Sequence, residues 1–313
     1  MIYTITLNPA VDRELTVPAI EFDTVLRATA WRVDCGGKGF NVSRMLKALG
    51  TDSVALGFAG GRAGELLRDG LESLGIATDF IWIAGETRTN VSIVNEVHDR
   101  YLKVNEPGPA IAAAAQEALL TQVQRLARPG DWWVLAGSLP PGLPASIYAD
   151  LIRIVQEAGG DAVLDSSGQA LRAGCAARPF LVKPNDAEAG QITGLPVDTT
   201  AAVVAAAQAI TELGVANVII SLGKKGALLA GGTGTWLATT VPIREANPIG
   251  AGDSMVGGLV WALNQGYNLP EALRWAIACG AATASMAGTA VGSPALVEEL
   301  APKVEIRPYQ ETT

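Results

Sequence analysis

The segment Asn247-Pro-Ile-Gly-Ala-Gly-Asp253-Ser254 combines a carboxylate with two glycines and runs straight into an apolar stretch that is typical of a helix. Gly250 and Gly252 allow the main chain to turn its N–H groups toward a ligand, and the first amides of a helix form an anion site. A carboxylate beside such a site can accept a proton from an attacking hydroxyl while the amides stabilise a transferring phosphoryl group. Alternatively, Asp253 only caps the helix and the glycines form a turn.

A second glycine cluster, Gly36-Gly37-Lys38-Gly39, opens the first clear helical pattern, with Asn41 in the expected first turn. Glycines before a helix allow the main chain to approach a polar ligand closely, and Lys38 adds a cation suited to a phosphate. Most clusters of this kind are simply turns. The cluster is not a Walker A loop, because the sequence contains no G-x-x-x-x-G-K-[ST] match. A P-loop kinase or GTPase is therefore not expected.

Polar residues follow three expected strands: Asp165-Ser-Ser-Gly168, Lys183-Pro-Asn185 with Glu188, and Ser221-Leu-Gly223-Lys-Lys-Gly226. Carboxylates at such places can hold Mg²⁺ through water when the metal is shared with nucleotide phosphates. Glu188 is equally explained as an acidic residue early in a helix, where it is favoured anyway. The third segment is either a nucleotide-contacting loop or a hairpin turn.

Arg88 and Asn90 lie at the entry to a β-rich segment. An arginine there can clamp a sugar phosphate through two hydrogen bonds, although an ordinary surface arginine is the default alternative. His98 is the only histidine and lies in a polar run, where we expect it to be solvated. A single histidine in such a run argues against a Ser-His-Asp hydrolase.

Short apolar strands alternate with helical patterns along the chain. The expected strands are 2–7, 54–58, 132–135, 162–164, 180–182 and 218–221, and the expected helices are 40–49, 65–74, 110–127, 147–158, 199–213, 253–263 and 270–286. This alternation indicates parallel βαβ units in a doubly wound sheet, which binds ligands at the carboxyl ends of its strands. Two β-rich segments, about 13–35 and 88–104, depart from the pattern, and we expect them to pair as a small lid over that edge.

The composition limits the classes of protein to consider. The 313 residues suit a single α/β domain spanning 1–313. With 23 Lys and Arg against 31 Asp and Glu, the chain lacks the general positive field of a nucleic-acid binder. The three cysteines fit neither a disulfide framework nor a zinc spacing. We recognise no signal peptide and no membrane span, so a cytoplasmic protein is the simplest interpretation.

Taken together, these motifs resemble the phosphofructokinase-B group of ribokinase-like sugar kinases. Eight motifs in the family's order carry the resemblance over nearly the whole chain: Thr6-Leu-Asn-Pro-Ala-Val-Asp12, Gly36-Gly-Lys-Gly-Phe-Asn41, Thr87-Arg-Thr-Asn90, Gly137-Ser-Leu-Pro-Pro-Gly142, Asp165-Ser-Ser-Gly168, Lys183-Pro-Asn185 with Glu188, Ser221-Leu-Gly223 and Gly250-Ala-Gly-Asp-Ser254. The resemblance implies a Rossmann-like ribokinase fold with a mostly parallel sheet flanked by helices. It also implies a β-lid that often forms a dimer contact, and MgATP as the donor.

The resemblance further implies a role for each matching residue. Asp253 matches the catalytic base, and the amides of Gly250, Ala251 and Gly252 match the anion hole. The positions that match the sugar-phosphate site are Asp12, Gly36, Gly37, Lys38, Asn41, Arg88, Asn90 and Ser138. Those on the nucleotide side are Lys183, Asn185, Ser221, Gly223 and Gly226. Glu188 matches the Mg²⁺ position, and the residues that match the K⁺ site of some members are Asn247, Ile249 and Gly288.

Within the group, 1-phosphofructokinases and tagatose-6-phosphate kinases match best. The minor bacterial 6-phosphofructokinase has a lysine where this chain has Val25, and a glycine where this chain has Lys38. The phosphate-binding cation therefore lies at a different position in this chain, which favours the first two activities over the third. We expect ATP-dependent phosphorylation of fructose 1-phosphate to fructose 1,6-bisphosphate by a homodimer joined through the lid. Tagatose-6-phosphate kinase and 6-phosphofructokinase are the alternative activities. A non-catalytic sugar-phosphate or nucleotide sensor is the alternative from another class, and the intact Asp253 argues against it.

Overall fold

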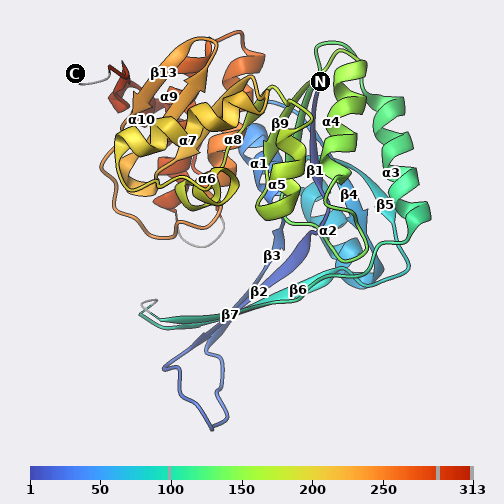
Figure 1. The fold of residues 1–313 in the computed structure, drawn as a ribbon. Coiled ribbons are helices and arrows are strands. Elements are labelled where there is room, and N and C mark those ends of the chain that lie inside the picture. The colour runs from blue at the N-terminus through green and yellow to red at the C-terminus, as the bar shows by residue number, and fades with distance from the viewer. Residues whose placement is uncertain (98–99, 287–289, 311–313) are drawn as a thin grey trace.

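A sheet of ten strands runs through the body of the molecule, with helices on both of its faces (Figure 1). The computed structural model describes residues 1–97, 100–286 and 290–310. The order across the sheet is β14 (Ile306–Pro308), β13 (Gly234–Ala238), β12 (Ala227–Gly231), β11 (Asn217–Ser221), β10 (Leu181–Val182), β9 (Asp161–Asp165), β8 (Trp132–Ala136), β1 (Ile2–Thr6), β4 (Val54–Ala59) and β5 (Ala77–Trp82). The pairings from β11 to β5 are parallel, and those from β11 to β14 are antiparallel. The predicted mostly parallel sheet is therefore confirmed.

The helices pack in two layers because successive side chains of a strand point to opposite faces of the sheet. The helices are α1 (Lys38–Ala48), α2 (Gly61–Ser73), α3 (Ala113–Leu126), α4 (Ile147–Glu157), α5 (Gly168–Cys175), α6 (Asp186–Thr193), α7 (Thr200–Glu212), α8 (Ala251–Asn264), α9 (Leu269–Ala284) and α10 (Pro294–Leu300). Tyr3 and Ile5 of β1 pack in the apolar cluster under α3 to α7. Ile2 packs in the cluster under α1, α8, α9 and α10. Among the described residues, no helix has the length and apolar character needed to cross a bilayer.

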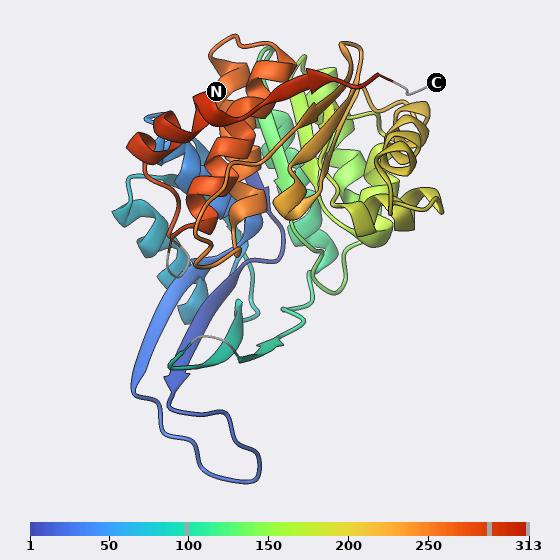
Figure 2. The same cartoon turned by 90° about the vertical axis from the view of Figure 1, so that its left-hand side faces the viewer.

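A second, four-stranded sheet projects from the body (Figures 1 and 2). We call it the lid sheet; its order is β3 (Ala30–Gly36), β2 (Ala10–Val17), β6 (Arg88–Asn95) and β7 (Tyr101–Asn105). Strands β2 and β6 pair in parallel, so the two β-rich segments that the sequence sets apart lie in one sheet. The sheet begins at Ala10, slightly earlier than the expected segment. The connection between β2 and β3 reaches furthest from the body (Figure 2).

Helix α8, which carries Asp253, is held close to its neighbours by two adjacent glycines. A Cβ atom on Gly257 would lie 2.8 Å from Cβ of Met45 in α1, and one on Gly258 would lie 2.5 Å from Sγ of Cys279 in α9. Any larger side chain at either position would push the helices apart. The close packing brings the first turn of α8 next to the first turn of α1, where the chemical groups of the two glycine motifs meet.

Candidate active site

The first turn of α8 is an anion site by its main-chain geometry. Gly250 precedes the helix with a φ of 79°, which lies in the left-handed region that glycine adopts without strain. The N–H groups of Ala251 and Ser254 donate to the carbonyls of Pro248 and Gly250. Within the described part of the chain, the N–H groups of Gly252 and Asp253 have no main-chain acceptor. Asp253 is the third residue of the helix and no side chain caps this end, so its role is not that of the cap.

The Asp253 carboxylate is buried and oriented. Asn41 of α1 donates from Nδ2 to its Oδ2 at 2.8 Å, and the residue is 8% exposed. Burial raises the pKa of Asp253 to about 6, and the nearby charge of Asp165 acts in the same direction, against the opposing effects of Lys38 and the Asn41 hydrogen bond. A carboxylate with such a pKa is a suitable general base near neutral pH, because it is largely ionised yet still holds a proton well.

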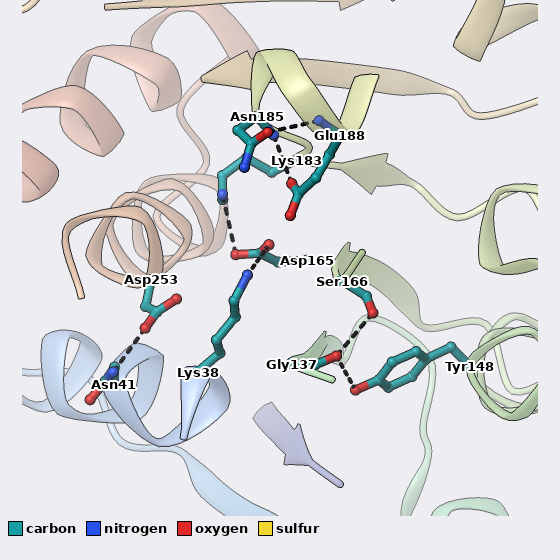
Figure 3. A network of polar contacts seen from close by, with 10 residues as sticks. All are labelled: Lys38, Asn41, Gly137, Tyr148, Asp165, Ser166, Lys183, Asn185, Glu188 and Asp253. Atoms are coloured by element: carbon teal, nitrogen blue, oxygen red, sulfur yellow. Dashed lines mark hydrogen bonds and ion pairs between the residues drawn. The ribbon is translucent and has the colours of Figure 1, made fainter. Parts of the chain in front are cut away.

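Asp165, at the end of β9, lies between two lysines (Figure 3). Its Oδ1 is 2.9 Å from Nζ of Lys38, and its Oδ2 is 3.2 Å from Nζ of Lys183. Burial alone would raise the pKa of Asp165, but the charges of Lys183 and Lys38 outweigh it and hold the pKa below its usual value. For Lys38, burial lowers the pKa, but Asp165 and Asp253 more than compensate and the pKa is raised. Asp165 and Lys38 are therefore both charged at neutral pH.

At the base of the lid sheet, a second carboxylate is fixed beside glycine. Asn90 of β6 donates from Nδ2 to Oδ1 of Asp12 in β2 at 2.8 Å. A Cβ atom on Gly36 would lie 2.3 Å from Oδ2 of Asp12, so only glycine leaves room for this carboxylate. These three residues were expected at the sugar-phosphate site, and the structure brings them together. Gly37 follows directly, just before α1.

Arg88 is half-buried and bound to the main chain. Its Nη1 donates to the carbonyl of Glu106 and its Nη2 to the carbonyl of Asn8, both at 2.9 Å. Burial lowers the pKa of Arg88, against the raising effects of Asp12 and Glu106. The guanidinium therefore joins the two ends of the second lid segment to the end of β1, and it is not an ordinary surface arginine. Ser138 is exposed in the loop after β8.

A cleft of about 690 Å³ lies beside the anion site. Its walls come from α8, α9 and the segment 240–248, and most of the lining is apolar. Ser221, Gly223 and Gly226, which were expected on the nucleotide side, line this cleft together with Ala251 and Gly252. Residues 221–226 also form the connection of the β11–β12 hairpin. The hairpin interpretation is therefore confirmed, and the nucleotide contact stays a prediction.

Two other residues expected on the nucleotide side lie elsewhere. Lys183 is buried against Asp165, and its Nζ is 3.6 Å from where a Cβ of Gly252 would be. Asn185 caps α6 in a reciprocal arrangement, accepting from N–H of Glu188 at 2.8 Å while its own N–H donates to Oε2 of Glu188 at 2.9 Å. Neither residue is among those that line the cleft. Lys183 therefore lies beside the anion site and outside the cleft.

The fit of a metal depends on Glu188. One of its carboxylate oxygens belongs to the helix cap, and the carboxylate still points toward Asp165 and Lys38 (Figure 3). Among the described residues, no group of three His, Cys, Asp or Glu side chains comes together. A Mg²⁺ ion at this place would keep its waters and share the nucleotide phosphates, as Mg²⁺ usually does, with the Glu188 carboxylate holding those waters.

Three expectations concern other parts of the chain. Oδ1 of Asn247 accepts a hydrogen bond from N–H of Ile249 at 3.0 Å, just before the anion site. Gly288, the third expected cation ligand, and His98 lie outside the described residues.

Sequence reasoning gave no separate role to Asn8, whose Nδ2 donates to the carbonyl of Pro107 at 3.1 Å. Its position between a buried strand and Pro9 was the available signal.

The parallel sheet, the projecting lid sheet and the carboxylate at a glycine-started helix define the ribokinase-like fold. The structure of Arabidopsis thaliana ribokinase superposes with a TM-score of 0.78 over 96% of this chain and 98% of that chain, at 19% identity, which supports the fold alone. The model of the pfkB family carbohydrate kinases matches residues 3–296. The chain belongs to this family, and the resemblance seen in its motifs is confirmed. It is therefore a carbohydrate kinase, which phosphorylates an alcohol group.

Several carbohydrate kinases are similar to this chain over nearly their full length. The 1-phosphofructokinase of Rhodobacter capsulatus is 36% identical over 307 residues, which cover 98% of this chain and 97% of the relative. The tagatose-6-phosphate kinase of Staphylococcus epidermidis is 34% identical over 284 residues, covering 90% and 91%. The crystal structure of phosphofructokinase-2 from Escherichia coli in complex with potassium has a TM-score of 0.92 and 32% identity, covering 96% of this chain and 98% of that chain.

Proposed function

We propose that the protein is a 1-phosphofructokinase, which transfers the γ-phosphoryl group of MgATP to the free C6 hydroxyl of fructose 1-phosphate. The observation that carries this proposal is the buried Asp253 carboxylate, in the same helix turn as the amide of Gly252, which has no main-chain acceptor among the described residues and whose residue lines an apolar cleft. The Lys38 ammonium group, at the start of α1, supplies a cation for a substrate that already bears a phosphate. Relatives named 1-phosphofructokinase, similar over nearly the whole chain, support the choice of sugar.

The proposed reaction is a single displacement. Asn41 holds Oδ2 of Asp253, so Oδ1 accepts the proton of the sugar hydroxyl. The hydroxyl oxygen forms a bond to the γ-phosphorus while the bond from that phosphorus to the β–γ bridging oxygen breaks, and ADP leaves with the electron pair. The amides of Gly250 and Gly252, joined by that of Ala251 when its N–H turns away from the carbonyl of Pro248, stabilise the charge on the transferring group, as preorganised donors do in water-excluded sites. ATP occupies the 690 Å³ cleft.

The sugar phosphate lies between the lid sheet and α1 in this proposal. Asp12 and Asn90, which already contact each other at 2.8 Å, bind sugar hydroxyls. The phosphate binds to cations and main-chain groups, namely Lys38 and Arg88 with Gly36, Gly37, Asn41 and Ser138. A kinase of an unphosphorylated sugar would not need two cations at this place.

Two metal ions belong to the proposal. Mg²⁺ bound to the ATP phosphates would neutralise part of their charge, and Glu188 would hold its water ligands. K⁺ would bind near the anion site, at the positions of Asn247, Ile249 and Gly288. Lys183 and Asn185 would support the nucleotide side, Lys183 through its position next to Gly252.

We also propose that two copies join through the lid sheet. The strand register places Leu15, Trp31, Ile93 and Leu102 in one row across the sheet, and Val104 two residues along the same face. Trp31 is 69% and Val104 66% exposed. The opposite face carries Asp12 and Asn90 and therefore looks toward the sugar site. An apolar face of this kind, unoccupied in a single chain, marks an interaction surface.

The test of the activity is ADP release with fructose 1-phosphate, fructose 6-phosphate, tagatose 6-phosphate and unphosphorylated sugars. The proposal expects the highest kcat/KM with fructose 1-phosphate. A higher value with tagatose 6-phosphate would make the protein a tagatose-6-phosphate kinase, an activity favoured by the 34% identical relative of that name. Binding of ATP without ADP release from any sugar would instead indicate the sensor.

A further inference from the structure

Asp165 makes two ion pairs with lysines from distant parts of the chain (Figure 3). Lys38 begins α1, and Lys183 directly follows β10. Each carboxylate oxygen contacts one ammonium group, at 2.9 Å and 3.2 Å, and the Asp165 side chain is 2% exposed. No oxygen of Asp165 is left pointing to solvent. The three charged groups therefore form one unit with a fixed order.

The unit of Lys38, Asp165 and Lys183 lies between the proposed ATP site and the proposed sugar-phosphate site. Nζ of Lys183 is 3.6 Å from where a Cβ of Gly252 would be, next to the unbonded amides of α8. Lys38 is 39% exposed, whereas Lys183 is 6% exposed. An ammonium group has three donors, and Asp165 takes one from each lysine, so donors remain on both for phosphate oxygens.

Lysine side chains are flexible, and two ammonium groups near each other repel. Without the carboxylate between them, Lys38 and Lys183 would separate and lose their orientation. We propose that Asp165 is a positioning residue for phosphoryl transfer, which holds the Lys183 ammonium group beside the transferring phosphoryl group and the Lys38 ammonium group on the side of the sugar phosphate. This inference rests on the proposed phosphotransferase function and adds a residue to which the motif resemblance gave no role.

A different role was considered for Asp165 from the sequence, namely that of a carboxylate holding Mg²⁺ through water. The geometry does not favour it, because both oxygens already accept from ammonium groups. The two roles predict different experiments. A metal-holding carboxylate can be compensated by a higher concentration of free Mg²⁺, whereas misplaced lysines cannot.

The test compares Asp165→Asn with Asp165→Glu in the full-length protein. Asparagine replaces one of the two acceptor oxygens with an NH2 group, which cannot accept from the lysine that it faces. Glutamate keeps the charge but extends the side chain by one methylene. We expect kcat to fall by about 100-fold in Asp165→Asn, the loss associated with misplacing a group by roughly 1 Å. We expect Asp165→Glu to remain well below wild type in kcat. If the role were only to neutralise buried lysines, Asp165→Glu would turn over normally.

The pH profile gives a readout that a purely structural role would not move. Asp253 faces Asp165, Lys38, Lys183 and Asn41, and the charge of Asp165 raises its pKa. The acidic limb of the profile should move to lower pH in Asp165→Asn and stay in place in Asp165→Glu. Should Asp165→Asn fail to fold, as judged by circular dichroism, the Glu variant alone decides the question.

Wild-type protein is measured in parallel with the sugar that gives the fastest ADP release. If fructose 1-phosphate is not that sugar, the proposed substrate is wrong, but the ratio of variant to wild type still tests Asp165. Normal kcat in Asp165→Asn or Asp165→Glu would overturn the inference. Recovery of full activity by added Mg²⁺ would overturn it as well and would assign Asp165 to the metal.

Discussion

Nδ2 of Asn41 donates a hydrogen bond of 2.8 Å to Oδ2 of Asp253, and this bond joins the first turns of α1 and α8. The two residues are 212 positions apart in the chain. Because one oxygen of the carboxylate is held, its other oxygen is directed to a single place. The two glycine-led helices, one expected to bind sugar phosphate and the other to bind the transferring group, thus share one site.

The pH dependence of activity should follow Asp253. Because burial raises its pKa to about 6, the base is protonated and inactive below that pH and ionised above it. We expect kcat/KM to fall about tenfold for each pH unit below 6 and to level off above it. The second ionisation of the sugar phosphate lies near the same pH, and ³¹P NMR of the free substrate measures it separately. If kcat/KM instead began to fall only near pH 4, burial would not raise the pKa of Asp253.

Replacing Lys38 should weaken binding of the sugar phosphate. A hydrogen bond to a charged group contributes about 1.5–3 kcal/mol, so Lys38→Ala should raise the KM for the sugar phosphate by about 10- to 150-fold. Steady-state kinetics with the sugar phosphate varied at saturating ATP measure the change. Lys47→Ala is the matched control on the same helix, since Lys47 pairs with the exposed Asp52. An unchanged KM in Lys38→Ala would remove Lys38 from the site.

Gly226→Ala should damage the nucleotide cleft. Gly226 has a φ of +99°, and a Cβ there would lie 2.0 Å from the carbonyl oxygen of Ala238. Strain of this kind costs at least about 1 kcal/mol, so we expect a lower Tm and a raised KM for ATP. Gly232→Ala is the control, because a Cβ at Gly232 meets no atom within 4 Å. If both variants bind ATP like wild type, the Gly226 turn does not shape the nucleotide site.

The lid sheet should control the oligomeric state. Trp31→Lys places a charge on its exposed apolar face, and we expect the dimer to dissociate, with a halved mass by light scattering after size exclusion. Leu74→Lys, at the end of α2 and 49% exposed, is the control and should leave the mass unchanged. A wild-type monomer, or a dimer that persists in Trp31→Lys, would contradict the proposed contact.

The centre of the fold could be predicted because its strands are buried on both faces and therefore read as continuous apolar runs. Strand β5 was missed because it lies at the edge of the sheet, where its residues are mostly half-exposed and Thr78 and Asp79 interrupt the apolar pattern. Helices α5 and α6 have eight residues each and offer too short a pattern. The antiparallel hairpin of β12 and β13 was also missed.

The site could be predicted where its signals are local. Glycines before helices located Lys38 and Asp253, and the Asn185-x-x-Glu188 spacing is that of a helix cap, which the structure has. The bridge from Lys38 to Asp165 spans 127 positions, and only tertiary packing brings these residues together. The contacts of Arg88 with main-chain carbonyls were beyond sequence reasoning for the same reason.

The most direct test of the whole account is the turnover of Asp253→Asn. The amide keeps the shape of the side chain but cannot take the proton of the sugar hydroxyl. We expect kcat for ADP release to fall by at least ~100-fold, the low end for loss of a positioned base, with the circular dichroism spectrum and ATP binding unchanged. Near-normal kcat in this folded variant would show that Asp253 is not the base and would contradict the mechanism.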